Sequence, residues 1–461
     1  MTIARREFIV SSGVLALGTT MPVSAIKAKE HRRMTDDDFS TDYLLSGRNP
    51  LATSDQKLVE DRALRLIGHP EFQRARNMAD QLFRWVLLPD AGDEAGAFDT
   101  FLDEYMFHYA MRAAANDPNY PTIMRFMTPP HHWFGRDVPG SRWGGDSPDF
   151  IYRVVTASHG PRYEIHGRAT SEVRPTVTYS LLADRQASSV VFSTLNSVDM
   201  EFGPDGEFVI TLDPSPADGR RNHIQTRPNC YAVWVRDQLG DWSTTSANAL
   251  RVRRIDPPAR APMTDDELAT WGANAAEDGI YYMHLLIRTS VLQQPNAMRP
   301  PAPTAALGGM PGQMSAGGRV KLAPDEALII RTNAAGALFR NMVLTEYFWM
   351  TWDYWDRQTS LNTGQMTPDE DGRFTFVLAH RDPGVANWLD TCGRSEMRIG
   401  QRWQSFANGA PNEPLEFSGK VVKFADIERE LPKGAARIDA EGRKRQLARR
   451  KAGFDRRFID S

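Results

Sequence analysis

The sequence has little cysteine and none of the common nucleotide-binding motifs. Its 461 residues include two cysteines, Cys230 and Cys392, and neither belongs to a Cys-x-x-Cys pair, so a zinc ribbon or a redox-active dithiol has no support. A disulfide between the two and two buried free thiols both stay open. The sequence also has no Gly-x-Gly-x-x-Gly fingerprint, phosphate loop or Gly-x-Ser-x-Gly elbow. We therefore expect no cofactor and no metal, and no α/β-hydrolase. General acid–base catalysis leaves no such motif.

The chain also lacks an excess of basic or acidic residues. The formal net charge is −3 with 25% charged residues, so we expect no nucleic-acid partner. Beyond the N-terminus there is no apolar stretch long enough for a membrane span. The exception to the even charge is the tail, residues 425–461, which is rich in Arg and Lys. It predicts a solvated terminal helix, with a polyanion-binding patch as the alternative.

The N-terminus resembles an export signal. Arg5 and Arg6 precede an uncharged run, residues 10–23, and the small residues around Ala25 suit a signal peptidase. This order of basic, apolar and small residues predicts a twin-arginine signal peptide over residues 1–28 and a periplasmic location. An N-terminal anchor or a buried helix is the alternative.

One stretch of the sequence recurs as a degenerate second copy. In both copies a Leu-Asn pair and a Met precede a shared Gly at the same offsets, and an alternating strand follows. Each copy then reaches an Asn-x-x-x-Thr unit and a strand that ends near an Arg and a Gln. We interpret this as a duplicated β unit. The matched residues are Leu195, Asn196, Met200, Gly206, Asn222, Thr226, Arg236 and Gln238 in the first copy, and Leu361, Asn362, Met366, Gly372, Asn387, Thr391, Arg402 and Gln404 in the second.

Periodicity predicts a mainly β protein with an α-helical N-terminal region, in which two related β-sandwich-like units are joined by a short helical connector. A capping-box pattern at Thr264 to Glu267 opens the connector. Residues 295–320 are rich in Pro, Gly, Ala and Met and predict a flexible linker. The expected segments are a helical and loop region at 54–143, the first β unit at 144–256, the connector at 264–292, the second β unit at 320–405 and the basic tail at 425–461.

Two stretches resemble a known family. The run from Gly144 to Arg153, followed by Tyr163-x-Ile165-x-Gly167, is similar to the start of β domains in the bacterial "domain of unknown function" family 1214. Asn387-Trp388-Leu389-x-Thr391 looks like the closing segment of that family, whereas the first copy has His223 in place of the Trp. The resemblance implies a double β-sandwich often found in exported bacterial proteins, and it implies no settled chemistry.

A loop with adjacent histidines is the first candidate site. His131 and His132 lie in a Pro/Gly-rich stretch beside Trp133. Loops with ionisable and aromatic residues often line sites, and a histidine there can serve as general base. We expect no metal, since His-x-His and His-x-x-x-His spacings are missing.

A dense aromatic run, residues 347–357, is the second candidate. On a strand, alternation would make both of its faces aromatic, so it would be either plain core or the wall of a pocket for a flat ligand. We expect the histidine loop to close over it and form a cavity. Asp353 and Tyr354 would act there in catalysis, and Trp352 and Trp355 in ligand binding.

Further residues complete the candidate set. Tyr152 and Arg153 join the pool of acids, bases and anchors, while Trp133, His223, Trp388, Asn222 and Asn387 are assigned to ligand binding. A role of the two asparagines in turn geometry is the alternative.

These features favour an exported, cofactor-independent enzyme of lyase or hydrolase type that acts on a small apolar or aromatic molecule by general acid–base chemistry. The alternative is a non-catalytic periplasmic protein that binds a ligand or assists assembly. Homo-oligomer formation is open.

Overall fold

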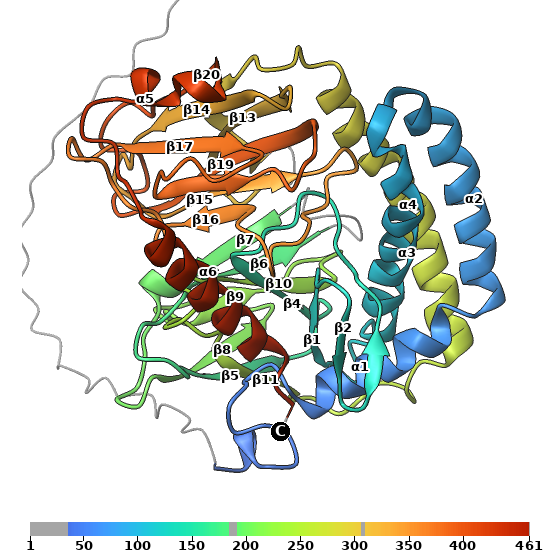
Figure 1. Cartoon of the computed structure of the whole chain (residues 1–461). Helices are drawn as coiled ribbons and strands as arrows, with labels where there is room; N and C mark the ends of the chain where they lie inside the picture. Colours follow the sequence, from blue (N-terminus) through green and yellow to red (C-terminus); the bar gives the residue numbers. More distant parts are fainter. Residues whose placement is uncertain (1–35, 184–190, 306–308, 461) are drawn as a thin grey trace, which may run out of the picture. The chain divides into compact units, whose positions relative to one another are not determined.

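The computed structural model describes residues 36–183, 191–305 and 309–460, which belong to one unit, residues 34–461. The predicted signal peptide lies outside the described residues. The fold is mostly β with an N-terminal helical region and a connector helix, as the sequence predicts (Figure 1).

The helical region consists of α1 (Ser54–Leu66), α2 (Pro70–Leu87) and α3 (Phe98–Ala114), preceded by the 3-10 turn η1 (Asp36–Phe39), with η2 (Leu88–Asp90) and η3 (Gly92–Ala97) between α2 and α3. The connector α4 (Asp265–Val291) begins with the expected capping box, in which Glu267 N donates to Thr264 Oγ1 over 3.2 Å and Thr264 N donates to Glu267 Oε2 over 2.8 Å. It packs against α2 and α3 and so completes the helical layer. No helix within the described ranges is long and apolar enough to cross a membrane.

The first β unit has two sheets. The five-stranded sheet has the order β1 (Ile123–Phe126), β4 (Phe150–Thr156), β10 (Ala232–Gln238), β6 (Thr176–Leu182) and β7 (Val191–Asn196). The four-stranded sheet has the order β11 (Ala249–Arg254), β5 (Tyr163–Arg168), β8 (Glu207–Asp213) and β9 (His223–Gln225), and the turn η4 (Ser197–Asp199) follows β7. A separate hairpin, β2 (His131–Trp133) with β3 (Arg136–Val138), carries the two adjacent histidines.

The second β unit repeats this topology strand by strand. Its five-stranded sheet has the order β12 (Arg299–Pro303), β13 (Met314–Lys321), β19 (Glu396–Phe406), β15 (Ala337–Thr345) and β16 (Ser360–Asn362). Its four-stranded sheet is β18 (Asn387–Asp390), β17 (Phe374–Ala379), β14 (Glu326–Thr332) and β20 (Phe417–Lys423), with β18 parallel to β17 as β9 is parallel to β8. The matching order agrees with the predicted duplication.

Two boundaries differ from the prediction. The stretch 295–320, predicted as a linker, contains β12 and most of β13, and the second unit continues past residue 405 to β20. β12 and β20 both gain their hydrogen bonds from neighbouring strands, and the Pro-rich local sequence of β12 did not reveal that strand.

The core has separate parts. Val155, Val233 and Val235 point into the first sandwich, while Val154 and Trp234, on the other face of the same sheet, pack against the helical layer. This two-sided burial follows from the alternation of side chains along a strand.

The tail is docked rather than solvated, so the prediction for it was wrong. After η6 (Phe424–Asp426) and α5 (Ile427–Glu430), α6 (Ala440–Asp455) and η7 (Arg456–Phe458) run along the β units (Figure 1). Arg443, Arg450 and Arg457 recur every seven residues on one face and are buried. Arg443 pairs with Asp382 of the second unit at 2.8 Å, and Arg457 donates to Pro148 O, which lies just before β4 of the first unit, at 2.8 Å.

Candidate ligand-binding site

The aromatic run is a series of turns, so its prediction as a strand was wrong. β15 ends at Thr345, and the carboxylate of Glu346 then accepts hydrogen bonds from Phe348 N at 3.0 Å and Met350 N at 2.9 Å. Trp349 has a positive φ of 64°. Because the carboxylate takes the backbone donors that a neighbouring strand would need, the chain turns and side-chain alternation no longer applies.

The aromatic side chains of this run separate. Trp352 lies in the core of the second unit with the Arg394 guanidinium 5.0 Å from its ring. Tyr354 and Trp355 pack on Phe454 of α6, and Asp353 is exposed. Trp352 is therefore core.

The histidines of the β2–β3 hairpin differ in burial. His131 is half-buried as a residue, and its side chain is 6% exposed, with Nδ1 2.8 Å from Pro129 O and Nε2 3.6 Å from a Glu60 carboxylate oxygen. Glu60 also accepts from Trp133 Nε1 at 2.8 Å and from Arg136 at 3.2 Å. His132 is exposed and lies 2.8 Å from Asp137.

The expected cavity between the histidine loop and the aromatic run is filled by the tail. Ring centroids follow one another from His131 to Phe458 at 4.5 Å, to Phe454 at 5.3 Å and to Tyr354 at 5.6 Å. Residues 454 and 458 thus occupy the place in which we expected a ligand.

Tyr152 and Arg153 are adjacent on β4 and so point to opposite faces. Arg153 forms a buried pair with Asp237 at 2.7 Å and donates to Asn248 O at 2.7 Å. Tyr152 lies on the other face, against Phe150, and burial raises the pKa of its hydroxyl. The structure therefore does not bring them together as one acid–base pair.

Asn222 and Asn387 have the same structural role in the two units. Asn222 accepts from Glu201 N at 2.9 Å and donates to Glu201 O at 2.8 Å. Asn387 makes both bonds with Thr367, each at 2.8 Å. These geometries agree with the turn interpretation. Trp388 donates to Ala379 O at 3.1 Å beneath Arg443.

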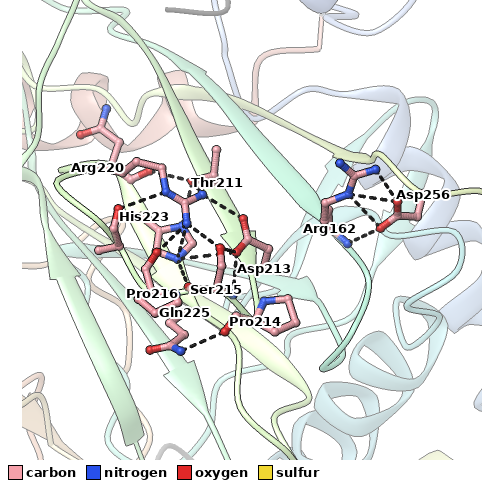
Figure 2. Close-up of polar contacts among 12 residues, drawn as sticks. Arg162, Thr211, Asp213, Pro214, Ser215, Pro216, Arg220, His223, Gln225 and Asp256 are labelled. Carbon is pink, nitrogen blue, oxygen red and sulfur yellow. Dashed lines mark hydrogen bonds and ion pairs between the residues drawn. The ribbon is translucent and has the colours of Figure 1, made fainter. Parts of the chain in front are cut away.

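His223 belongs to a closed polar cluster in the loop after β8 (Figure 2). Its Nδ1 lies 2.8 Å from Thr211 Oγ1 and its Nε2 2.9 Å from Ser215 O, while Arg220 pairs with Asp213 at 2.9 Å. Burial lowers the pKa of His223. Both ring nitrogens therefore have partners, Thr211 on β8 and Ser215 in the loop that follows it.

A small pocket, partly open to solvent, lies where η3 and α4 meet β13, β19 and the turn that follows β15. The one aromatic-run residue that lines it is Tyr347, and Arg398 from β19 lies at the same wall. The lining residues are Glu94, Val291, Arg319, Tyr347, Glu396, Met397 and Arg398.

Arg398 is the unusual member of this pocket. Its side chain is 6% exposed, its guanidinium lies 3.9 Å from the Trp349 ring centre, and its Nη1 has no hydrogen-bond partner. Burial lowers its pKa to about 9, which leaves it charged at neutral pH. No carboxylate of the described residues forms an ion pair with it.

The acids of the pocket already have partners. Glu396 lies 2.8 Å from Arg319 and 2.7 Å from Lys321, which lower its pKa although burial opposes them. Glu94 pairs with Arg394, yet burial raises its pKa. Arg398 is therefore a buried cation without a carboxylate partner in the part of the chain that the structure describes.

Neither Arg398 nor Glu94 was among the site residues expected from the sequence. The repeat gave a signal close to Arg398, because β19 also carries Arg402 and Gln404, the matched residues of the second copy. The burial of Arg398 depends on η3 and α4, which lie far away in sequence. No group of three or more His, Cys, Asp or Glu suited to a metal occurs among the described residues, and both cysteines are free thiols.

No family model and no curated protein matches this sequence. The fold is similar to the crystal structure of an uncharacterized protein from Burkholderia cenocepacia, with a TM-score of 0.64 and 25% identity over 79% of this chain and 99% of that one. A Vibrio parahaemolyticus protein aligns over 60% of this chain and 90% of its own, with 11% identity and a TM-score of 0.36. The first likeness shows that this arrangement of helices and strands occurs in another bacterial protein.

Proposed function

We propose that the protein binds a small organic anion, with a carboxylate on a flat apolar body, in the Arg398 pocket. The single observation that carries this proposal is the buried, charged guanidinium of Arg398 without a carboxylate partner. Taking a charge out of water is costly unless it is paired, so a ligand carboxylate has an energetic advantage there.

The remaining walls suit the apolar part of such a ligand. Val291 and Met397 provide aliphatic surface, and Tyr347 provides an aromatic ring. Ligand-binding sites typically combine apolar walls with a few charged groups that fix the orientation of the ligand. This is the binding alternative of the sequence analysis, with the ligand moved from the histidine loop to the pocket between the helical layer and the second β unit.

Calorimetric titration with benzoate tests the proposal. Arg398→Gln should weaken binding by about tenfold or more, since a hydrogen bond to a charged group contributes about 1.5–3 kcal/mol. Arg340→Gln is the matched control, because Arg340 also lies over a ring, Phe374 at 4.3 Å, but does not line the pocket. If Arg398→Gln bound benzoate with unchanged affinity, the proposed binding function would be wrong.

An acid–base enzyme is the second candidate, and Glu94 is the observation that favours it. This carboxyl group lines the same pocket and has a raised pKa, as proton-transfer groups often do. With Arg398 holding a substrate carboxylate, Glu94 would exchange a proton with the substrate. Product formation that disappears in Glu94→Gln, with benzoate affinity kept, would select the enzyme over the binding protein.

We also propose that the protein is exported by the twin-arginine route and belongs with the 1214 family. The Arg5-Arg6 pattern supports the first proposal, and the paired β-sandwich topology is compatible with the second.

A further inference from the structure

Helix α2 lies at the outer edge of the helical layer and packs against α4 (Figure 1). Three polar side-chain pairs connect the two helices, the last of them through η2, which directly follows α2. The pairs are His69 with Asp266, Arg74 with Glu277 and Asp90 with Arg288. Because the partners follow one another in the same order along both segments, the two helices run in the same direction with matching positions side by side.

Each helix has an exposed stripe at these matching positions. Side chains spaced by four, four and three residues share one face of a helix. This spacing relates Arg74, Met78, Leu82 and Trp85 on α2, and Glu277, Tyr281, Leu285 and Arg288 on α4. Since Arg74 pairs with Glu277 at one end, the two stripes adjoin. We call the surface that they form, together with Asp90 at the other end, the α2–α4 face.

The apolar middle of the α2–α4 face is large for a protein surface. Within the part of the chain that the structure describes, Trp85 is 78% exposed and Tyr281 is 73% exposed. These two side chains alone offer roughly 300 Å², since a whole aromatic side chain has about 150–250 Å². Met78, Leu82 and Leu285 are 39%, 39% and 43% exposed. With these residues and its charged ends, the face approaches the about 800 Å² that each partner contributes to a standard protein interface.

The charges at the four corners of the α2–α4 face alternate in sign. Beside α2 the corners are Arg74 and Asp90, and beside α4 they are Glu277 and Arg288, in the opposite order of charge. Their side chains are 21–47% exposed and can therefore reach a partner. A two-fold axis in the plane of the face, along the helices or across them, brings each corner opposite a corner of the other sign on a second copy. The face is thus complementary to itself.

We propose that the α2–α4 face is the contact surface of a homodimer, in which the same face of two copies packs together. Trp85 and Tyr281 are its anchors, because Trp and Tyr are among the residues that most often dominate interface energies. A membrane surface is a poorer partner, since it favours an excess of Lys and Arg beside the apolar residues, whereas the cations of this face are balanced by carboxylates. None of these residues lines the Arg398 pocket, so the dimer does not depend on the function proposed for that pocket.

Sedimentation equilibrium of the full chain over a range of concentrations tests the dimer. We expect twice the mass of one chain, with dissociation on dilution. Trp85→Ser/Tyr281→Ser should raise the dissociation constant at least about a hundredfold, because both anchors are lost from both copies. Val198→Ser/Leu338→Ser is the matched control. These side chains are 58% and 51% exposed but belong to η4 and β15, so the constant should not change.

A charge reversal tests the complementarity of the corners. Arg288→Glu places a carboxylate opposite either Asp90 or Glu277 of the second copy, depending on the direction of the axis, and should weaken the dimer about tenfold or more. Arg84→Glu is the control, because Arg84 is also exposed and paired, but with Asp80 and with Asp99 of α3, away from the stripe. It should leave the dissociation constant unchanged. Circular dichroism of each variant checks that the fold is retained.

A dimer that is weakened by the face variants and not by their controls supports the proposal. A monomeric mass at every concentration would overturn it, and so would a dimer that the Trp85→Ser/Tyr281→Ser variant leaves intact. Sedimentation with phosphatidylglycerol vesicles examines the other occupant. A monomer that binds these vesicles, and loses this binding in Trp85→Ser/Tyr281→Ser, would assign the face to a membrane surface and overturn the dimer.

Discussion

Asp149 accepts a hydrogen bond of 2.7 Å from Asn362, which belongs to the other β unit. Asn341 donates to the second carboxylate oxygen at 3.0 Å. The Gly-Gly-Asp-Ser-Pro-Asp stretch that carries the family resemblance thus forms part of the contact between the two β units. Gly145 N donates to Trp349 O at 2.8 Å there, and a Cβ on Gly145, whose φ is +81°, would lie 2.9 Å from the Trp349 ring.

Removing this carboxylate should destabilise the protein. Asp149→Ala leaves buried donors of Asn341, Asn362 and Trp242 without their acceptor, so we expect a loss of about 2–4 kcal/mol in unfolding free energy. Urea denaturation of Asp149→Ala, Asn362→Ala and the double variant measures the coupling, which should be at least about 0.5 kcal/mol. Additive losses would mean that the two side chains stabilise the fold independently.

Glu346 should make the protein less stable as the pH rises. Burial raises its pKa from 4.5 to about 8, against the two backbone hydrogen bonds it accepts. Between these values the folded state holds a proton that the unfolded state has lost, so unfolding free energy falls with rising pH, by at most about 1.4 kcal/mol per unit. Glu346→Gln should flatten this slope in denaturation curves from pH 5 to pH 8. If the slope did not change, the fall of unfolding free energy with pH would come from other ionisable groups.

The buried arginines of α6, Arg443 and Arg450, should increase the free energy of unfolding, whereas the exposed arginines of the same helix should not. Arg450 lies 4.2 Å from the Trp242 ring centre and donates to Ser360 Oγ and Gln365. We expect Arg450→Ala to lower unfolding free energy by about 1–3 kcal/mol. Arg445→Ala, at an exposed position of the same helix, should change it by less than about 0.5 kcal/mol. Similar values for the two variants would contradict the docked tail.

The two adjacent histidines should respond differently to substitution. His131→Ala opens a space beside Phe458 and Trp133 and should cost about 1–3 kcal/mol of stability. His132→Ala should be nearly neutral, since His132 is exposed. Thermal unfolding of both variants compares them, and equal melting temperatures would speak against the burial of His131.

Export can be tested with residues 1–35 fused to a folded reporter. The twin-arginine pattern predicts that the reporter reaches the periplasm and that Arg5→Lys with Arg6→Lys retains it in the cytoplasm. Export of the double variant through the route for unfolded chains would refute the assignment.

The sequence by itself determined the elements whose signals are local. The apolar periodicity of α3, the capping box of α4 and the alternation in β8 and β17 depend on near neighbours, so they were readable. The repeat was readable too, because duplicated strands keep the same turn residues at the same offsets. Asn222 and Asn387 are the clearest pair.

Tertiary structure alone decided which ionisable groups share a pocket. Arg398 is buried where η3 and α4 meet its strand, and Arg457 is buried because the tail docks beside Trp242. The same docking filled the space expected between His131 and the aromatic run. Burial and counter-ions depend on contacts between residues hundreds of positions apart, and the periodicity of a single segment carries no information about them.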